Sequence, residues 1–182
     1  MDWTLTDKDF QRVKQTAVKV LQGLQEANLH VRALSHGIMP VQIDAEGLRS
    51  ALAELASTTN ELEQVRCRFE FSGTGNIPNN SIATQLYRIA QESLSNALKH
   101  GQADEIIISL SLEVEQIVLE VFDNGVGFDP GVARRFAAGG VGFGLQIMEY
   151  RASMICGVLQ IDKSESVGTT VRCTVPASGC MQ

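Results

Sequence analysis

The stretch from Gln85 to Gly101 reads QLYRIAQESLSNALKHG, and the rest of the chain is best understood from it. On a helix that turns about 100° per residue, its apolar residues fall on one broad face. Glu92, Asn96 and Lys99 fall together on the opposite face, one above another. A solvated surface is the ordinary explanation for such a polar face. A carboxylate, an amide and an ammonium group in one row also suit a metal ion and a phosphate, so a nucleotide–metal site is a second interpretation.

The composition of the chain excludes several broad classes of protein. Its 182 residues are 44% hydrophobic, which is enough for a substantial core in one domain with an appendage. The net charge of −6 argues against a nucleic-acid binder, because such proteins carry a basic surface. No apolar run approaches the roughly 20 residues that span a bilayer. We therefore expect no membrane contact within this sequence, and any anchor of a longer parent protein should lie outside it.

The four cysteines are far apart in the sequence and show no C-x-x-C spacing. Metal-finger and disulfide-scaffold interpretations are therefore weak, and we expect reduced thiols and a cytoplasmic location.

The first third of the chain is predicted to be helical. Residues 6–35 contain no proline and repeat apolar residues at helical spacing, which predicts one long amphipathic helix. Its apolar stripe must pack either on the rest of the chain or on another helix, such as one from a second copy. Gly37 and Pro40 are expected to end this helix. Asp44 is expected to cap a second helix, which buries its leucines.

Alternating apolar and polar residues predict the first and the last strand in the remainder of the chain, and an abundance of β-branched residues predicts the second and third. The predicted strands are Val65–Phe71, Glu105–Leu112, Gln116–Phe122, Val158–Asp162 and Thr169–Val175. Ser81 is expected to cap the helix that contains the opening stretch, and a last helix is predicted over Gln146–Ile155. This order predicts an α+β fold: a two-layer α/β sandwich with a mixed, mostly antiparallel sheet and an N-terminal helical segment.

The third predicted strand runs into Asp123-Asn124-Gly125-Val126-Gly127. A tight turn is the ordinary interpretation, since Asp-Asn-Gly is favourable turn chemistry. The alternative is a nucleotide site. In that case the carboxylate accepts the exocyclic amine of adenine, and the glycines leave room for the flat ring.

A second glycine-rich stretch, Gly139-Gly140-Val141-Gly142-Phe143-Gly144, precedes a helix that begins near Leu145. Backbone N–H groups at a helix N-terminus attract anions, so this stretch favours a phosphate site over a flexible loop. The chain contains no G-x-x-x-x-G-K-[ST] sequence, and these glycines miss the G-x-G-x-x-G spacing. P-loop and Rossmann nucleotide sites are therefore excluded.

Four motifs follow one another along the chain: Glu92-x-x-x-Asn96-x-x-Lys99-His100, Asp123-x-Gly125-x-Gly127, Gly140-x-Gly142-x-Gly144-Leu145 and Gly168-Thr169. Their order resembles the N, G1 and G2 boxes and the terminal Gly-Thr of the histidine-kinase, gyrase, chaperone and mismatch-repair ATPase superfamily. More narrowly, LYRIAQESLSNALKH, DNGVGFD and GLQIMEYRA resemble sensor histidine kinases that pair with helix-turn-helix response regulators. The resemblance extends from Val31 to Pro176.

The resemblance implies a Bergerat-type ATP site that uses ATP and Mg²⁺. Asn96 would coordinate the metal, and Lys99 and His100 would approach the phosphates. Glu92 would polarise the metal's water, which makes it a further metal contact through water, or it would assist the attacking nucleophile. Glu92 and Asn96 are thus the implied catalytic residues.

The same resemblance implies how adenine would be held. Asp123 would bind the adenine amine, Thr169 would support that contact and Gly127 would line the ring. Gly142 and Gly144 would close over the phosphates. The remaining residues implied to bind the nucleotide are Gly125, Gly140 and Leu145.

The implied activity is that of a protein-histidine kinase. The chain would be the ATP-binding catalytic domain of a two-component sensor histidine kinase, a homodimer at full length. It would transfer the γ-phosphate of ATP to a histidine on a helix missing from this chain, for relay to an aspartate of a response regulator receiver domain. Neither His30 nor His36 is followed by an acidic residue that could orient its ring, so His36 is interpreted as structural and self-phosphorylation is not expected. The alternatives are an ATPase and an inactive nucleotide-binding or dimerisation module of the same superfamily.

The domain division that follows has three parts. Residues 1–62 would be a helical remnant of the dimerisation and phosphotransfer hairpin, residues 63–177 the catalytic domain, and residues 178–182 a tail. In the lid, Pro130–Gly139, the residues Arg134 and Arg135 are expected to form a surface charge pair, with a phosphate contact as the alternative.

Overall fold

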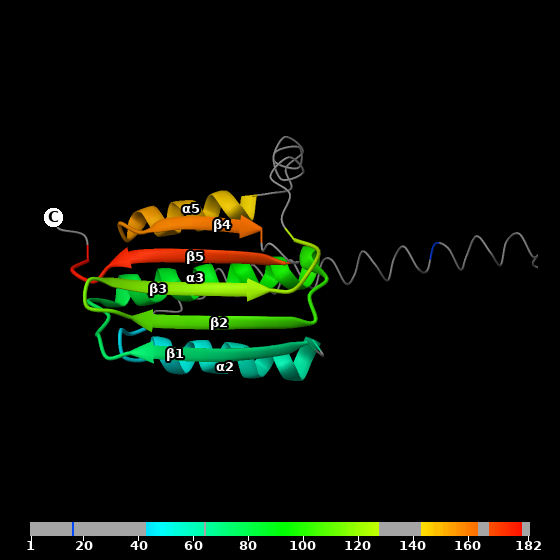
Figure 1. Cartoon of the computed structure of the whole chain (residues 1–182), viewed down its shortest axis with the longest axis horizontal. Coiled ribbons are helices and arrows are strands. Elements are labelled where there is room, and N and C mark those ends of the chain that lie inside the picture. Colours follow the sequence, from blue (N-terminus) through cyan, green and yellow to red (C-terminus); the bar gives the residue numbers. More distant parts are fainter. Residues whose placement is uncertain (1–15, 17–42, 64, 128–142, 164–167, 180–182) are drawn as a thin grey trace, which may run out of the picture. The chain divides into compact units, whose positions relative to one another are not determined.

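The computed structural model describes residues 16, 43–63, 65–127, 143–163 and 168–179 (Figure 1). By its internal contacts the chain divides into two compact units, Met1–Val41 and Gln42–Gln182. Thr16 is helical, and the rest of the helix predicted over residues 6–35 lies outside the described residues, as do Gly37 and Pro40. The predicted boundary between residues 62 and 63 falls inside the second unit, which holds all the elements described below.

The described strands of the second unit form a single sheet of five, in the order β1-β2-β3-β5-β4 (Figure 1). They are β1 (Arg66–Gly73), β2 (Glu105–Leu112), β3 (Gln116–Asp123), β4 (Val158–Lys163) and β5 (Thr169–Pro176). β1 and β2 are parallel, and the other neighbouring pairs are antiparallel. The predicted mixed, mostly antiparallel sheet is confirmed, with no strand end displaced by more than two residues.

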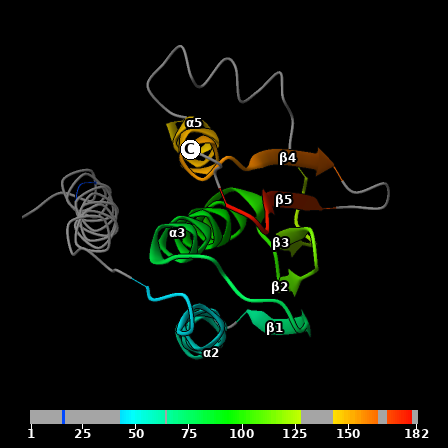
Figure 2. The same cartoon turned by 90° about the vertical axis from the view of Figure 1, so that its left-hand side faces the viewer.

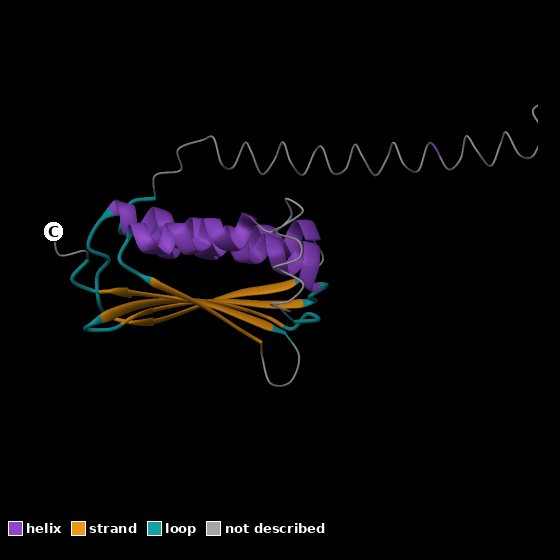
Figure 3. Ribbon diagram, turned by 90° about the horizontal axis from the view of Figure 1, so that it is seen from above, coloured by secondary structure: helices purple, strands orange, loops and turns teal. Residues whose placement is uncertain are grey.

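Three α-helices within the described residues cover one face of this sheet: α2 (Leu48–Glu63), α3 (Asn80–Asn96) and α5 (Phe143–Met154). Figures 2 and 3 show them as one layer lying against the strands. Every second residue of β2 and β3 is buried, because alternate side chains of a strand point to opposite faces. The two-layer α+β sandwich is thus confirmed. No helix of the described part is long and apolar enough to cross a bilayer.

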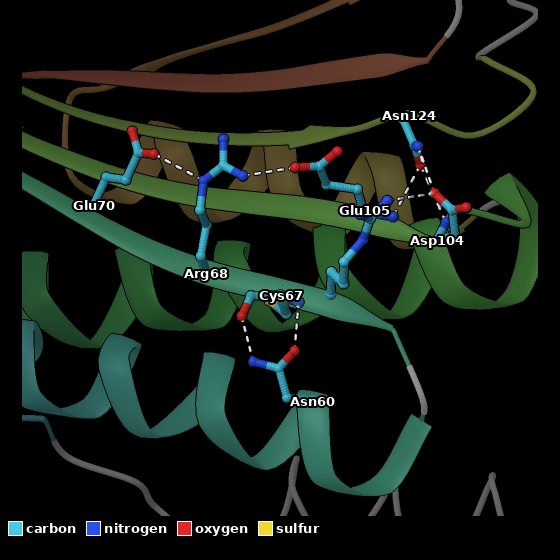
Figure 4. Close-up of polar contacts among 8 residues, drawn as sticks. Asn60, Cys67, Arg68, Glu70, Asp104, Glu105 and Asn124 are labelled. Carbon is cyan, nitrogen blue, oxygen red and sulfur yellow. Dashed lines mark hydrogen bonds and ion pairs between the residues drawn. The ribbon is translucent and has the colours of Figure 1, made fainter.

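Helix α2 binds the outer edge of the sheet at one residue of β1. The Oδ1 atom of Asn60 accepts a 2.8 Å hydrogen bond from the N–H of Cys67, and its Nδ2 donates to the carbonyl of the same residue (Figure 4). The amide thereby satisfies edge-strand groups that would otherwise be free to pair with another chain. Leu48 and Leu52 of α2 are completely buried, so α2 shares the core of the sheet.

The start of α3 differs from the prediction. The helix is capped by Asn79, whose side-chain oxygen accepts a 2.9 Å hydrogen bond from the N–H of Ile82. The prediction that Ser81 caps the helix is therefore wrong, because an asparagine with extended backbone stands two residues earlier and reaches the first turn.

The other two helix starts are shifted as well. Asp44 accepts a hydrogen bond from the N–H of Gly47, as a cap does, but regular helix begins only at Leu48. Helix α5 begins at Phe143, two residues before the start predicted near Leu145 and three before the helical spacing noted from Gln146, so the end of the second glycine-rich stretch is already helical.

The cysteines at described positions are of two kinds. Cys67 and Cys173 are free and buried, and burial raises the pKa of the first thiol to about 11 and of the second to about 12. Cys156 is disulfide-bonded, so the expectation of reduced thiols is wrong for this residue.

Candidate nucleotide-binding site

Parts of all four motifs converge at one end of the sandwich. In Figure 1 the end of β3, the beginnings of β2 and β5 and the beginning of α5 lie on the same side. The strand register places Asp123 of β3 directly opposite Thr169 of β5. Two motifs that are 46 positions apart in the chain, at residues 123 and 169, are thus neighbours.

Asp123, the last residue of β3, is buried, with only 6% of its surface exposed. Its Oδ1 accepts a 2.9 Å hydrogen bond from the N–H of Gly125. Burial raises the pKa of this carboxyl, and hydrogen bonds from the Gly125 backbone and from Thr169 act in the opposite direction. The result is an acceptor held in one orientation at a site largely shielded from water, which suits recognition of an amine on a flat base.

The turn after Asp123 lies against η1 (Ala97–Gly101), a π-helical turn that continues α3. The N–H of Val126 donates a 2.8 Å hydrogen bond to the carbonyl of Gly101. A β-carbon on Gly125 would overlap that carbonyl oxygen, so only glycine allows this close approach.

Gly101 is a site residue that sequence reasoning missed. A β-carbon there would lie 3.2 Å from Oδ1 of Asp123 and 4.0 Å from the carbonyl oxygen of Asn96, so Gly101 lies between the two halves of the candidate site. In the sequence it is only the last residue of the stretch Gln85–Gly101, with no role predicted for it. The signal that could have revealed it is its position directly after Lys99-His100 in the first motif.

Gly168 allows β5 to begin beside Asp123. Its φ of 126° lies in a region that residues with a side chain rarely adopt, and a β-carbon there would overlap the carbonyl oxygen of Asp123. Gly127 also has a positive φ, 83°, and is half-buried. The glycines of the second and fourth motifs therefore shape the backbone around one carboxylate.

Glu92 and Asn96 lie in the last turn of α3, both half-buried, beside the first turn of α5. A β-carbon on Gly144 would overlap Oε1 of Glu92 and lie 3.6 Å from Nδ2 of Asn96. Leu145, the next residue, packs against the core. A carboxylate, an amide and the amino end of a helix thus meet at one place. Oxygen ligands suit Mg²⁺ and helix N–H groups suit phosphate, so these residues fit both groups.

Lys99 and His100 are exposed and belong to η1 rather than to a continuing α-helix. A π-helical turn has wider i→i+5 spacing, so the α-helical spacing used to predict the row of Glu92, Asn96 and Lys99 ends at Asn96. The alignment of Lys99 with the other two residues stays a prediction, as does the approach of Lys99 and His100 to phosphates.

Several predicted residues lie outside the described part of the chain. These are Gly140, Gly142, His30, His36 and the lid residues Arg134 and Arg135. Among the residues that the structure does describe, no three His, Cys, Asp or Glu side chains are grouped as metal ligands. Mg²⁺ at a phosphate site usually takes one or two protein ligands and completes its shell with phosphate and water, so the residues present are sufficient.

Comparison with known proteins defines the class. Residues 81–179 match the family described as histidine kinase-, DNA gyrase B- and HSP90-like ATPase, and the chain belongs to this family. The match begins in α3 and ends after β5, so it contains all four motifs.

Relatives of the chain include proteins named as histidine kinases. The chain is 30% identical over 170 residues to sensor histidine kinase LiaS of Bacillus subtilis, which covers 93% of this chain and 44% of that protein. It is 34% identical over 146 residues to oxygen sensor histidine kinase NreB of Staphylococcus carnosus, covering 80% and 41%. For the histidine-protein kinase/phosphatase DegS of Bacillus subtilis the identity is 32% over 143 residues, covering 76% and 36%. The chain thus spans less than half the length of these relatives.

Solved structures share the fold. The ATP-binding domain of PrrB from Mycobacterium tuberculosis matches with a TM-score of 0.55 at 20% identity, covering 74% of this chain and 95% of that one. The histidine kinase domain of a blue-light-activated kinase from Erythrobacter litoralis EL346 matches with a TM-score of 0.55 at 21% identity, covering 72% and 61%. At this level of identity the likeness concerns the fold alone.

Proposed function

We propose that this chain is the ATP-binding catalytic domain of a two-component sensor histidine kinase that pairs with helix-turn-helix response regulators. The observation that carries the proposal is the buried carboxylate of Asp123, held by Gly125 and Thr169 where β3, β5 and η1 meet. Family membership and the names of the relatives support it, because each of them is called a histidine kinase.

Asp123 would accept the exocyclic amine of adenine. Oδ1 accepts one hydrogen bond from the Gly125 N–H. A carboxylate has further lone pairs, and these would accept from the base. Thr169 would hold the carboxylate from the β5 side, and burial would keep water from competing for it. This arrangement favours an amine donor over a carbonyl at the same position of the base.

At the other end of the site, bound ATP and Mg²⁺ would supply the phosphoryl group and neutralise its charge. The amide oxygen of Asn96 would hold the metal, and Glu92 would orient a water or the attacking nucleophile. The first N–H groups of α5, around Gly144, would face the phosphates. In phosphoryl transfer the protein contributes mainly positioning and electrostatic stabilisation, which such fixed groups supply.

The acceptor is proposed to be a histidine outside this chain, on an upstream helix of a homodimeric parent. The receiver domain of a response regulator would then accept the phosphate in the cytoplasm. The chain spans less than half of its relatives, which supports a catalytic part of a longer protein. Residues 1–62 as a hairpin remnant, 63–177 as the catalytic domain and 178–182 as a tail stay a prediction.

Thermal unfolding with and without Mg·ATP tests the adenine assignment. A nucleotide at a hundredfold excess over its Kd should stabilise the wild type by about 2.7 kcal/mol. Asp123→Ala should abolish this stabilisation. Asp162→Ala, which removes an exposed carboxylate from β4, should preserve it. Undiminished stabilisation of the Asp123 variant would remove the assignment.

Phosphate transfer separates the kinase from the alternatives. The chain is mixed with labelled ATP and with a separate domain that carries the parent's upstream helix, and acid-labile phosphate on that domain is measured. Transfer is expected, and it should be lost in Asn96→Ala, while ATP binding without metal should survive. Hydrolysis of ATP that is equally fast without the acceptor would favour an ATPase instead, and label on His36 would overturn its structural interpretation.

A further inference from the structure

Asn124 follows Asp123, but its side chain reaches away toward the start of β2. Its Oδ1 accepts hydrogen bonds from the N–H groups of Asp104 at 3.1 Å and Glu105 at 3.0 Å. Its Nδ2 donates to the carboxylate of Asp104 at 2.6 Å (Figure 4). The backbone N–H of Asn124 also donates to the carbonyl of Glu105 at 3.2 Å. One residue of the turn is therefore bound four times to two consecutive residues of a neighbouring segment.

This set of contacts requires an amide. The side chain must accept from two N–H groups and also donate to a carboxylate, and only the Asn or Gln group does both in a planar arrangement. Aspartate at position 124 would keep the acceptor but set a second carboxylate against Asp104, and alanine would leave both N–H groups without this partner.

The contacts of Asn124 matter because its neighbour Gly125 donates a hydrogen bond to the carboxylate of Asp123. On the other side of Gly125, the N–H of Val126 is bound to the carbonyl of Gly101. The Gly125 N–H, which holds Oδ1 of Asp123 at 2.9 Å, thus lies between two anchored residues. A glycine between two anchors has little freedom, whereas a glycine with one free side can take many conformations. The direction of the Asp123 carboxylate consequently depends on both anchors.

We propose that Asn124 is a positioning residue for adenine recognition. By anchoring the turn to β2 it keeps the Gly125 N–H, and through it the Asp123 carboxylate, in the orientation that selects an amine. Asn124 acts through these two residues and needs no contact with the nucleotide. This inference rests on the proposed function and adds to it the residue that sets base selectivity.

The test compares two nucleotides, Mg·ATP and Mg·ITP, which carry an amine and a carbonyl respectively at the same ring position. The Kd of each nucleotide is measured by calorimetry. The readout is the Kd for Mg·ITP divided by the Kd for Mg·ATP, called the ratio below. Asn124→Ala should lower this ratio about tenfold, toward the value for Asp123→Ala, because the acceptor is no longer held in place. A purely structural role would lower the melting temperature and leave the ratio unchanged.

A reciprocal swap provides the rescue. Asn124→Asp alone should lower the ratio, since it loses the donor and repels Asp104. Adding Asp104→Asn restores an amide–carboxylate pair in the opposite sense, so the double variant should recover most of the wild-type ratio. This pair keeps the inference testable if Asn124→Ala does not fold, because it preserves the size and polarity of both side chains.

Asn60→Ala is the matched control. It also removes an asparagine that binds backbone N–H and C=O groups, but at Cys67 on the outer edge of β1. It should lower stability and leave the ratio unchanged. A wild-type ratio in a folded Asn124→Ala protein, or an equal fall in Asn60→Ala, would overturn the inference alone. Wild type that binds no ATP would overturn the proposed function and the inference together.

Discussion

Gly144 of α5 lies directly against Glu92 of α3, so closely that a β-carbon on the glycine would overlap the carboxylate oxygen Oε1. Two helical turns further along, Arg151 of α5 donates a 2.9 Å hydrogen bond to Gln85 of α3. Gly144 and Arg151 are as far apart along α5 as Gln85 and Glu92 are along α3. The two helices therefore run antiparallel and stay in register. This register places Glu92 at the amino end of α5.

Gly144→Ala should therefore impair catalysis more than binding. The added methyl group meets the flexible end of a side chain rather than backbone, so we expect Glu92 to rotate away and the fold to survive. The rate of phosphate transfer should fall by about tenfold or more, as for loss of one oriented catalytic group, with ATP affinity within about threefold of wild type. Separate measurement of kcat and KM checks this.

The control for this variant is Gly47→Ala. Its β-carbon would likewise meet a carboxylate oxygen, Oδ1 of Asp44, at 2.9 Å, but in the turn before α2. It should leave the transfer rate unchanged. An unchanged rate in Gly144→Ala would show that the position of Glu92 does not matter for the reaction.

Asp123 should make the nucleotide-free protein less stable as the pH rises. Burial raises its pKa in the folded state, so the folded protein binds the proton more tightly than the unfolded chain does. Stability is then lost as the pH rises from the ordinary carboxyl pKa of 3.8 through the raised folded value, and stays constant above it. Asp123→Asn, which keeps an acceptor for Gly125, should therefore melt higher than wild type at pH 7.

Calorimetric melting over a pH series checks this prediction. The difference in melting temperature between Asp123→Asn and wild type should shrink as the pH falls through the folded pKa of Asp123. A difference that stays constant down to pH 3 would contradict the assigned direction of the pKa shift.

Gly168→Ala should destabilise the fold itself. The β-carbon would overlap the backbone carbonyl of Asp123, which is fixed by the sheet, and a φ of 126° is strained for alanine. We expect a loss of about 2–3 kcal/mol in the free energy of unfolding, measured in urea. Gly144→Ala should lose less than about 1 kcal/mol, because a side chain can move and a strand cannot. Equal losses would refute this distinction.

Cys67 and Cys173 should resist alkylation in the folded protein. Both are buried, and their raised pKa values of about 11 and 12 leave almost no thiolate at pH 8. Iodoacetamide labelling followed by mass spectrometry should modify them only after unfolding. Labelling of either residue in the native state, as fast as a free thiol, would show that the helices and the sheet open readily.

Local sequence patterns determined the helices and strands of this protein and the functional groups available to its candidate site. The β-branched residues of EIIISLSL predict β2 with its exact bounds, because such side chains favour the extended backbone of a strand. The four motifs likewise identified Asp123, Asn96 and Glu92, since each type of chemistry requires a particular functional group. The cap of α3 was misplaced from Asn79 to Ser81, because several residues near the helix start could serve and only the backbone conformation selects one.

The tertiary structure alone decided how these groups meet. The roles of Gly101 and Asn124 come from hydrogen bonds to residues that are distant in the chain, Val126 in one case and Asp104 in the other. The π-helical turn that contains Lys99 and the contact of Gly144 with Glu92 likewise appear only in the folded structure. Periodicity reports which side of an element is buried, but not what lies against it. For that reason the sequence predicted the parts of the site, and the fold determined their arrangement.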